Sequence, residues 1–189
     1  MGHSREEKSQ SHERIVAAAR GLMMEAGTGS PSVAEVMSAA GLTHGGFYKH
    51  FGSRDELVAA AVAAAMTAGD EAIRALIAEA EDPLAAFVEW YASPEHRDNL
   101  SESCGVARFG SDALGADEQL RQIYGAQVER YVGLLQELLG ADGSREAAIA
   151  AMSTLVGALD AARAVADEAL SAEILASARA SVLSRRGGG

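Results

Sequence analysis

Residues 43–51 are the part of the chain whose side-chain types and spacing indicate a specific chemistry. Their sequence is Thr43-His44-Gly45-Gly46-Phe47-Tyr48-Lys49-His50-Phe51. Two consecutive glycines cost the interior of a helix about 2 kcal/mol relative to alanine, so they need a compensating reason. Without Cβ atoms, the first turn of such a helix can lie directly against a phosphate or the edge of a base. We therefore interpret this segment as a short helix shaped to contact nucleic acid.

The other side chains of this segment divide into an inward and an outward set. Phe47 and Phe51 lie about one helical turn apart and are expected to pin the segment to a small core. The polar side chains are then expected to point outward: His44, Tyr48, Lys49 and His50. Metal binding by the two histidines is disfavoured, because a six-residue spacing puts them on different faces of an ideal helix. No metal site is predicted.

The charge of the chain is unevenly distributed. The net charge is −11, which argues against indiscriminate binding to nucleic acid. Residues 1–60 hold six basic and seven acidic side chains, whereas the remainder holds ten basic and twenty acidic ones. Residues 42–54 contain no acidic side chain but include Lys49 and Arg54. An acidic body with one cationic strip can steer a polyanion onto that strip alone.

The composition excludes several classes of protein. Hydrophobic residues make up 48% of the 189, which suffices for a packed core. The single cysteine, Cys104, permits no intramolecular disulfide and cannot form a structural zinc site. No signal-peptide pattern and no uninterrupted apolar segment of about 18 residues occurs, so a soluble, cytoplasmic protein is expected. No catalytic group of side chains has a convincing spacing, so we expect neither an enzyme nor a cofactor.

Hydrophobic periodicity and capping patterns predict an all-α protein of about nine helices. Ser32 with Glu35 and Ser53 with Glu56 have the spacing of capping boxes, and Asp82 followed by proline predicts a further helix start. The predicted helices span residues 11–26, 33–40, 43–51, 54–76, 83–91, 106–114, 117–140, 145–165 and 168–184. Between them, residues 93–102 are expected to form the longest loop, and residues 185–189 a tail.

Residues 41–57 resemble the signature of the TetR/AcrR family of bacterial transcriptional repressors. The signature consists of the segment above, the preceding Gly-Leu pair and the following Gly-Ser-Arg-Asp-Glu-Leu. The match extends over roughly residues 12–60, and order, spacing and flanking caps all agree. The resemblance implies an N-terminal three-helix, helix-turn-helix domain over residues 1–56 that binds DNA. It also implies a C-terminal helical domain over residues 57–189 that binds a ligand and dimerises.

The resemblance also implies roles for individual residues. The residues that match Ser32 and Tyr48 in the family contact phosphates, and the basic residue that matches Arg54 helps to hold the DNA backbone. Arg54 stands where the family commonly has lysine, so the positive charge is retained. The positions from Thr43 to Gly46 match residues that face the groove. The candidate DNA-binding residues are Ser32, Thr43, His44, Gly45, Gly46, Tyr48, Lys49, His50 and Arg54.

Aromatic residues beyond the signature are candidates for a hydrophobic ligand pocket. The candidate ligand-binding residues are Phe87, Trp90, Tyr91, Cys104, Phe109 and Tyr124. For any single aromatic residue, a place in the core is the competing interpretation. Cys104 also has two interpretations, a buried inert thiol or a sensor of electrophiles or oxidants, with Arg108 one turn on to favour the thiolate.

The last two predicted helices are expected to form a homodimer. Small side chains gather on the first of them: Ala147, Ala148, Ala150, Ala151, Gly157, Ala158, Ala161 and Ala162. An apolar stripe lies beside them and continues on the last helix: Ile149, Met152, Val156, Leu159, Leu170, Ile174, Leu175 and Val182. Two such pairs can form a four-helix bundle between subunits. The alternative is that both helices only cover the ligand-binding domain.

These observations favour a ligand-responsive repressor that a small, hydrophobic inducer releases from a pseudo-palindromic DNA operator. Two recognition helices of a symmetric dimer would enter major-groove faces about one helical turn apart. A helical enzyme is disfavoured by the missing catalytic arrangement. A ligand-binding or interaction module that has lost DNA affinity is the second alternative, which the net charge of −11 favours. Repression and activation are not distinguished by the sequence, and neither is the identity of the inducer or the operator.

Overall fold

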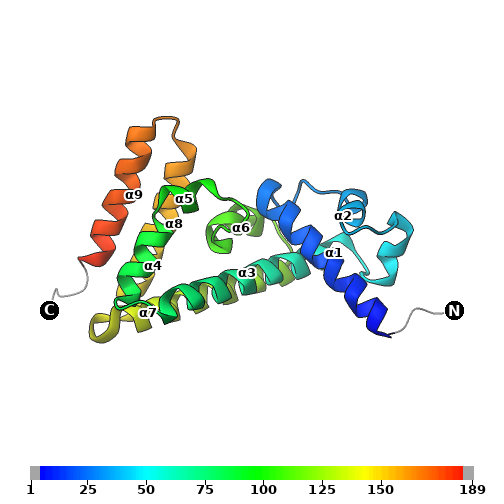
Figure 1. Cartoon of the computed structure of the whole chain (residues 1–189), viewed down its shortest axis with the longest axis horizontal. Coiled ribbons are helices and arrows are strands. Elements are labelled where there is room, and N and C mark those ends of the chain that lie inside the picture. Colours follow the sequence, from blue (N-terminus) through cyan, green and yellow to red (C-terminus); the bar gives the residue numbers. More distant parts are fainter. Residues whose placement is uncertain (1–4, 185–189) are drawn as a thin grey trace.

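The computed structural model describes residues 5–184, and within them the chain is helical throughout, with no β-strand. Nine α-helices and two short 3-10 helices follow one another (Figure 1). They are α1 (Arg5–Ala26), α2 (Val33–Ala39), η1 (His44–Lys49), α3 (Arg54–Ala78), α4 (Pro83–Tyr91), α5 (Pro94–Asp98), α6 (Gly105–Leu114), α7 (Glu118–Leu139), η2 (Gly140–Asp142), α8 (Arg145–Ala164) and α9 (Glu168–Leu183). The expected tail, residues 185–189, lies outside the described residues. The predicted all-α fold is confirmed.

The N-terminal helices follow the capping pattern of the sequence, with one difference. The Ser32 hydroxyl accepts the Glu35 amide proton at 3.2 Å, and the Glu35 carboxylate accepts the Ser32 amide proton at 2.8 Å. This confirms the predicted capping box of α2. Helix α1 begins at Arg5, however, six residues before the predicted start at Ser11. Its first turn carries acidic residues that suit a helix N-terminus, so polar composition alone misplaced the boundary.

Residues 44–49 form a 3-10 helix, η1, rather than the predicted α-helix. Thr43 precedes it with an extended backbone but makes no side-chain capping bond, which differs from the expected cap. Gly41, with a φ of 69°, makes the left-handed turn that joins α2 to this segment. Without a side-chain cap and with two adjacent glycines, the tighter helix of six residues replaces an α-helix.

Two further local predictions need correction. The Ser53 hydroxyl accepts the Glu56 amide proton at 3.1 Å, but the Glu56 carboxylate accepts the amide proton of Gly52 rather than that of Ser53. The start of α3 therefore has only half of the predicted capping box. Residues 93–102 contain α5, because Ser93 caps the amide of His96 at 3.0 Å and Pro94 occupies the first turn.

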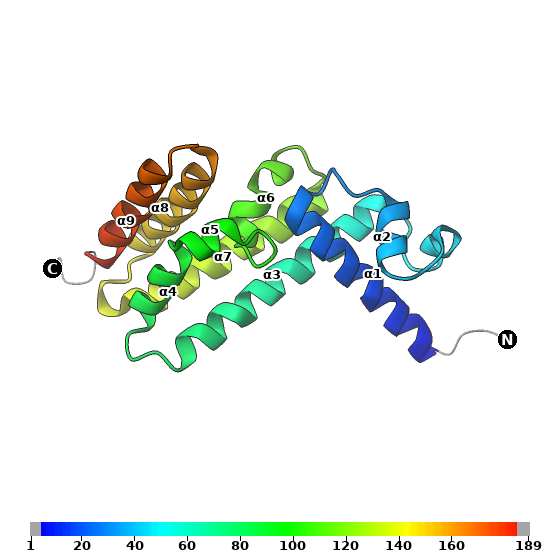
Figure 2. The ribbon, with the colours of Figure 1, turned by 45° about the horizontal axis from the view of Figure 1, so that its top comes forward.

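Two hydrophobic cores lie along the molecule, one at each end. The N-terminal core joins buried residues of α1, α2 and η1 to the first half of α3, and it also contains Phe109 of α6 and Leu120 of α7. The C-terminal core joins α4 to the second half of α7 and to α8 and α9. Figure 2 shows α1–η1 and α8–α9 at opposite ends, with α3, α6 and α7 between them. The N-terminal end is therefore packed directly onto helices of the C-terminal end.

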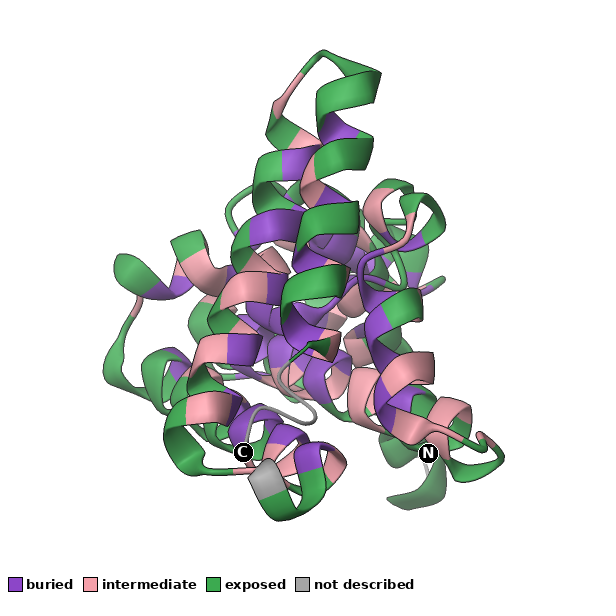
Figure 3. Ribbon diagram, turned by 90° about the vertical axis from the view of Figure 1, so that its left-hand side faces the viewer, coloured by how far each residue is buried: buried purple, intermediate pink, exposed green. Residues whose placement is uncertain are grey.

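Helices α8 and α9 lie side by side at the end of the molecule far from η1 (Figure 1). Part of the predicted small-residue surface is used inside the chain, because Ala148, Ala151, Ala158 and Ala162 are buried in it. Exposed residues alternate with buried ones along this end of the molecule (Figure 3). By length and composition, α8 is also the one helix among residues 5–184 that could cross a membrane. It packs on α7 and α9, and its high hydropathy comes from alanine-rich sequence.

Candidate nucleic-acid interface

Two phenylalanines attach η1 to the N-terminal core. Phe47 and Phe51 expose only 1% and 2% of their surface, and their rings stack with centroids 5.7 Å apart. His12 of α1 stacks on the other side, with its ring 4.6 Å from that of Phe51. Because the apolar side chains point inward at this spacing, the residues between them are turned outward. The inward half of the segment is thus a rigid support for its outward half.

The outward half of η1 offers an exposed polar face with little bulk at its start. Tyr48 exposes 77% of its surface, although it is a large aromatic residue, and Thr43, His44 and Lys49 are exposed as well. A Cβ atom on Gly45 would meet nothing within 4 Å. The space in front of the first turn is therefore open, and an approaching backbone or base edge would meet main chain there.

Ser32 and Arg54 lie beside η1 but are engaged in bonds within the chain. The Ser32 hydroxyl also donates to the Glu35 carboxylate at 2.7 Å, and these hydrogen bonds lower the pKa of Glu35. The half-buried guanidinium of Arg54 donates from Nη2 to the carbonyl oxygens of Thr28 and Pro31. Arg54 thereby fixes the loop before α2 and orients the N-terminus of that helix.

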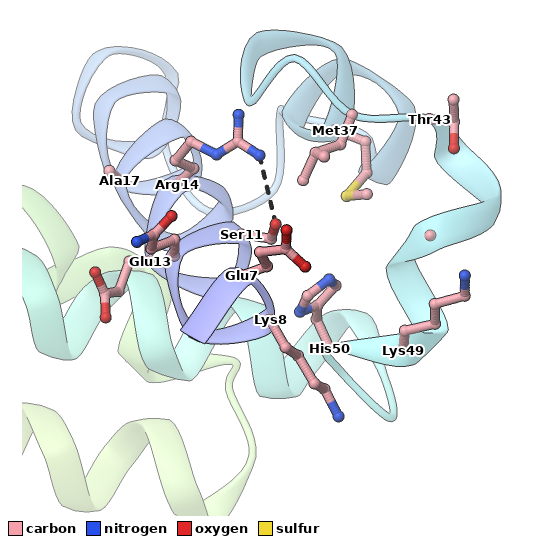
Figure 4. A pocket seen from close by; sticks show the side chains of 13 residues that line it. Glu7, Lys8, Ser11, Glu13, Arg14, Ala17, Met37, Thr43, Lys49 and His50 are labelled. Carbon is pink, nitrogen blue, oxygen red and sulfur yellow. Dashed lines mark hydrogen bonds between the residues drawn. The ribbon is translucent and has the colours of Figure 1, made fainter. Parts of the chain in front are cut away.

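His50 lines a cleft between η1 and the first half of α1, with a volume of about 1420 Å³. In Figure 4, Lys8 of α1 and Lys49 of η1 flank the His50 ring. The Nδ1 atom of His50 is buried and has no hydrogen-bond partner within residues 5–184. Burial lowers the pKa of His50, and the positive charges of His12, Lys8 and Lys49 lower it further. His50 therefore lies in a locally cationic environment inside an acidic protein.

Comparison with known proteins agrees with this geometry. The family model described as "Bacterial regulatory proteins, tetR family" matches residues 15–61, which contain the capped α2, the Gly41 turn, η1 and the start of α3. The N-terminal segment of the chain therefore matches the TetR family. The sequence resemblance stated above is thus confirmed. Members of this family are DNA-binding transcriptional regulators, in general without enzymatic activity.

Solved structures of TetR-family regulators share the fold of the whole chain. One from Cytophaga hutchinsonii has a TM-score of 0.80 at 16% identity, covering 97% of this chain and 98% of its own. One from Agrobacterium tumefaciens has a TM-score of 0.76 at 22% identity, covering 94% and 98%. One from Chloroflexus aurantiacus has a TM-score of 0.75 at 20% identity, covering 95% of both chains. Among curated proteins, no sequence matches this chain.

The candidate ligand-binding residues are divided between the two cores. Phe87 and Tyr91 are fully buried in the C-terminal core, and Trp90 and Cys104 line a narrow cleft there together with Tyr131. Two others lie elsewhere. Phe109 belongs to the N-terminal core, and Tyr124 packs on both cores and donates its hydroxyl proton to the Val106 carbonyl at 3.0 Å.

His96 is a buried residue of the C-terminal domain that the sequence analysis did not single out. The Cys104 amide donates to its Nε2 atom at 3.1 Å, so the ring proton is on Nδ1, which donates to the Tyr91 carbonyl at 2.7 Å. Its ring stacks on Trp90 at 4.4 Å. Arg163 donates to the His96 carbonyl at 3.0 Å and closes the cluster. One histidine in a polar segment gave no pattern from which this network could have been predicted.

Helix α6 connects the two ends of the chain through contacts that no local sequence pattern indicates. Arg108, expected one turn from Cys104 as a partner for its thiolate, instead donates from Nε to the Met24 carbonyl of α1 at 2.6 Å. Asp112 accepts the hydroxyl proton of Thr28 at 2.6 Å and its amide proton at 3.2 Å. Because the partners are 84 residues apart, no local pattern predicts them.

No group of three or more potential metal ligands occurs among the described residues. His44 is the first residue of η1 and His50 directly follows its last residue. His44 is exposed, whereas His50 faces the cleft. His50 instead lies near His12, with ring centroids 6.2 Å apart. The two neighbouring histidines in this region therefore come from α1 and from the end of η1.

Proposed function

We propose that the protein is a ligand-responsive repressor, located in the cytoplasm, that a small hydrophobic molecule releases from a pseudo-palindromic operator. The observation that supports this most directly is the open, polar face of η1 on a support of buried phenylalanines. A face of this kind fits the major groove, where glycines allow close approach and the flanking side chains reach phosphates. Residues up to 56 form the DNA-binding domain in this proposal, and residues 57–189 form the regulatory domain.

The residues have distinct roles in this proposal. Tyr48 and Lys49 bind backbone phosphates, as their exposure allows. Residues 43–46 face the base edges, where His44 carries the longest side chain and therefore the most sequence information. Ser32 lies at the N-terminus of α2, where a phosphate is favoured, and Arg54 keeps that terminus in position.

The dimer forms through α8 and α9 in this proposal. Ile149 exposes 41% and Leu170 44% of its surface, unusual fractions for large apolar residues. A shallow groove lies next to Leu170 and is lined by Ala158, Ile174 and Ala178 of the two helices. Covering this apolar area with the same face of a second copy gives a two-fold symmetric pair with one η1 in each subunit.

Ligand binding acts on DNA binding through α6. The cleft at Trp90, Cys104 and Tyr131 is narrow, so an apolar ligand enters by moving the segment before α6. Because Phe109 is in the N-terminal core and Asp112 holds Thr28, a shift of α6 moves the DNA-binding end. A difference of about 1–3 kcal/mol in ligand affinity between two dimer shapes is sufficient to release the operator.

Substitutions in η1 test the DNA-binding assignment. Tyr48→Phe and Lys49→Ala remove phosphate contacts, so both should weaken binding to all DNA sequences by about 3- to 30-fold at 0.1 M salt. His44→Ala should instead change which sequences are preferred. Binding is measured by fluorescence anisotropy on a duplex selected from a random library by the protein itself. Arg121→Ala, an exposed cation on α7, is the matched control.

The competing function is a ligand-binding module without DNA affinity, which the net charge of −11 favours. A DNA-binding protein releases counterions on binding, so its affinity falls steeply as salt rises. If no sequence is selected and no salt-sensitive binding is found, the repressor proposal is wrong. Unchanged affinity and preference in all three η1 variants would likewise exclude η1 as the DNA-contacting element.

A further inference from the structure

The first half of α1 borders the same cleft as the DNA-facing residues of η1. Thr43, Gly46 and Lys49 form one wall of this cleft, and Lys8 and Arg14 of α1 lie on the other (Figure 4). A DNA strand that passes along the groove-facing side of η1 therefore also passes in front of α1. No residue of α1 has so far been given a role in binding.

Charged side chains of both signs line this cleft, and the cations lie nearest to His50. The cleft is lined by the cations Lys8, Arg14 and Lys49 and by the acidic residues Glu7 and Glu13. The charged groups that act on the pKa of His50 are all cationic: His12, Lys8 and Lys49. Within residues 5–184, neither Lys8 nor Lys49 takes part in an ion pair with a carboxylate. In a chain with a net charge of −11, such a group of cations favours an anion locally.

His12 of α1 lies beside His50, with ring centroids 6.2 Å apart, but it does not line the cleft itself. A phosphate in the cleft can accept a hydrogen bond of about 2.8 Å from a ring nitrogen of His50. The buried Nδ1 atom of His50 has no partner within the described chain, so a binding event that reorients this ring gains a hydrogen bond. His12 is held in place by its stacking on Phe51.

We propose that the cleft between α1 and η1, bounded by Lys8, Lys49 and His50, binds a DNA backbone phosphate and takes up a proton from solvent when it does so. The inference rests on the proposed DNA-binding function and adds α1 to the contact surface. In free protein, burial and the neighbouring cations disfavour a protonated His50 ring, whereas a bound phosphate favours it. DNA affinity therefore rises as the pH falls from 8 to 6.

The experiment compares Lys8→Ala with Arg74→Ala, an exposed cation on α3 outside the cleft. The full-length protein is titrated onto the library-selected duplex at several salt concentrations. Loss of one phosphate contact per subunit should lower the slope of log affinity against log salt by about 0.9 for each subunit. Arg74→Ala should leave the slope as in the unsubstituted protein.

A second measurement follows the proton. Binding enthalpies in buffers of different ionisation enthalpy should report net proton uptake near pH 7, and His50→Gln should reduce that uptake and flatten the rise in affinity between pH 8 and pH 6. Melting temperatures check that this variant is folded, and Lys8→Ala, at an exposed position, tests the site independently of it.

The outcomes separate this inference from the proposed function. If the unsubstituted protein selects a duplex but Lys8→Ala keeps its salt slope and His50→Gln keeps its proton uptake, the cleft does not bind phosphate and only the inference fails. If the unsubstituted protein shows no salt-sensitive binding at all, the DNA-binding proposal fails first, and the cleft has no DNA to contact.

Discussion

At the scale of single residues, His96 is a buried side chain whose ring is held by hydrogen bonds. Both of its ring nitrogens are used, one as a donor to Tyr91 and the other as an acceptor from Cys104, so the neutral ring is the form that the fold requires. Burial lowers the pKa of His96, and the charge of Arg163 lowers it further. Cys104 is the N-cap residue of α6. The hydrogen bond from its amide to His96 therefore also fixes where that helix starts.

The first residue-scale prediction concerns the pH dependence of stability. Because the pKa of His96 is lower in the folded chain than in the unfolded one, the unfolded chain takes up a proton that the native ring does not. The contribution of His96 to the free energy of unfolding should therefore be fully present above the unfolded pKa of about 6.5 and decrease as the pH drops below it. Urea titrations between pH 7.5 and 5 measure this change.

The variant His96→Gln isolates that contribution. It should lower the free energy of unfolding at pH 7.5 by about 1–3 kcal/mol, because buried hydrogen bonds are lost, and its pH profile should be flatter. His50→Gln is the comparison, since the pKa of His50 is also lowered but its ring is less buried. Parallel profiles for the native chain and His96→Gln would show that His96 does not titrate as described.

Helix α6 packs against both hydrophobic cores of the molecule. It begins at Gly105, where an added Cβ atom would collide with the Met66 side chain of α3. Glycine at this position therefore allows α6 to pack closely against α3. About two turns later, Asp112 holds the loop between α1 and α2. The helix is therefore in contact with both cores and cannot shift without affecting each.

The element-scale prediction is that Asp112→Ala loosens the connection of α6 to the DNA-binding end. Loss of both hydrogen bonds to Thr28 should speed hydrogen exchange in residues 27–31 and lower the free energy of unfolding by about 1–2 kcal/mol. Mass spectrometry of peptides from the exchanged protein measures this effect. Ser111→Ala, an exposed neighbour on α6, should change neither quantity. Equal exchange in both variants would mean that the contact does not hold the loop.

The elongated arrangement of the whole molecule puts η1 and the apolar face of α8–α9 at opposite ends (Figure 2). A symmetric dimer formed at the latter face holds two copies of η1 on one rigid frame, because helices α3 and α7 run between the ends. Binding of one copy to DNA then makes binding of the second an intramolecular event, with a high effective concentration. Dimerisation and DNA affinity are therefore expected to change together.

The whole-molecule prediction is that Leu170→Glu shifts the protein from dimer to monomer. A charge placed in a covered apolar interface is not compensated, which costs several kcal/mol of association free energy. Light scattering after size exclusion measures the mass, and operator affinity should fall by more than about tenfold with it. Glu89→Gln, an exposed position on α4, serves as the control. A dimeric Leu170→Glu protein would place the interface elsewhere.

The sequence alone determined the features that depend on residues close together in the chain. The capping of α2 by Ser32, the start of α4 at Asp82 and the inward direction of Phe47 and Phe51 follow from contacts within about four residues, which periodicity and caps report directly. The family signature belongs to the same class, because it is a contiguous run. The short α5 was missed because its cap stands among polar residues that are typical of a loop.

Only the tertiary structure decided which distant groups meet. The assignment of Phe109 to the N-terminal core, of Arg54 to the carbonyls near Thr28 and of Arg108 to Met24 depends on how helices cross, and a side chain's type does not specify which crossing helix it reaches. The same holds for the His12–His50 pair. Packing free energy, summed over the whole chain, selects these contacts, so they become visible only when the chain is folded.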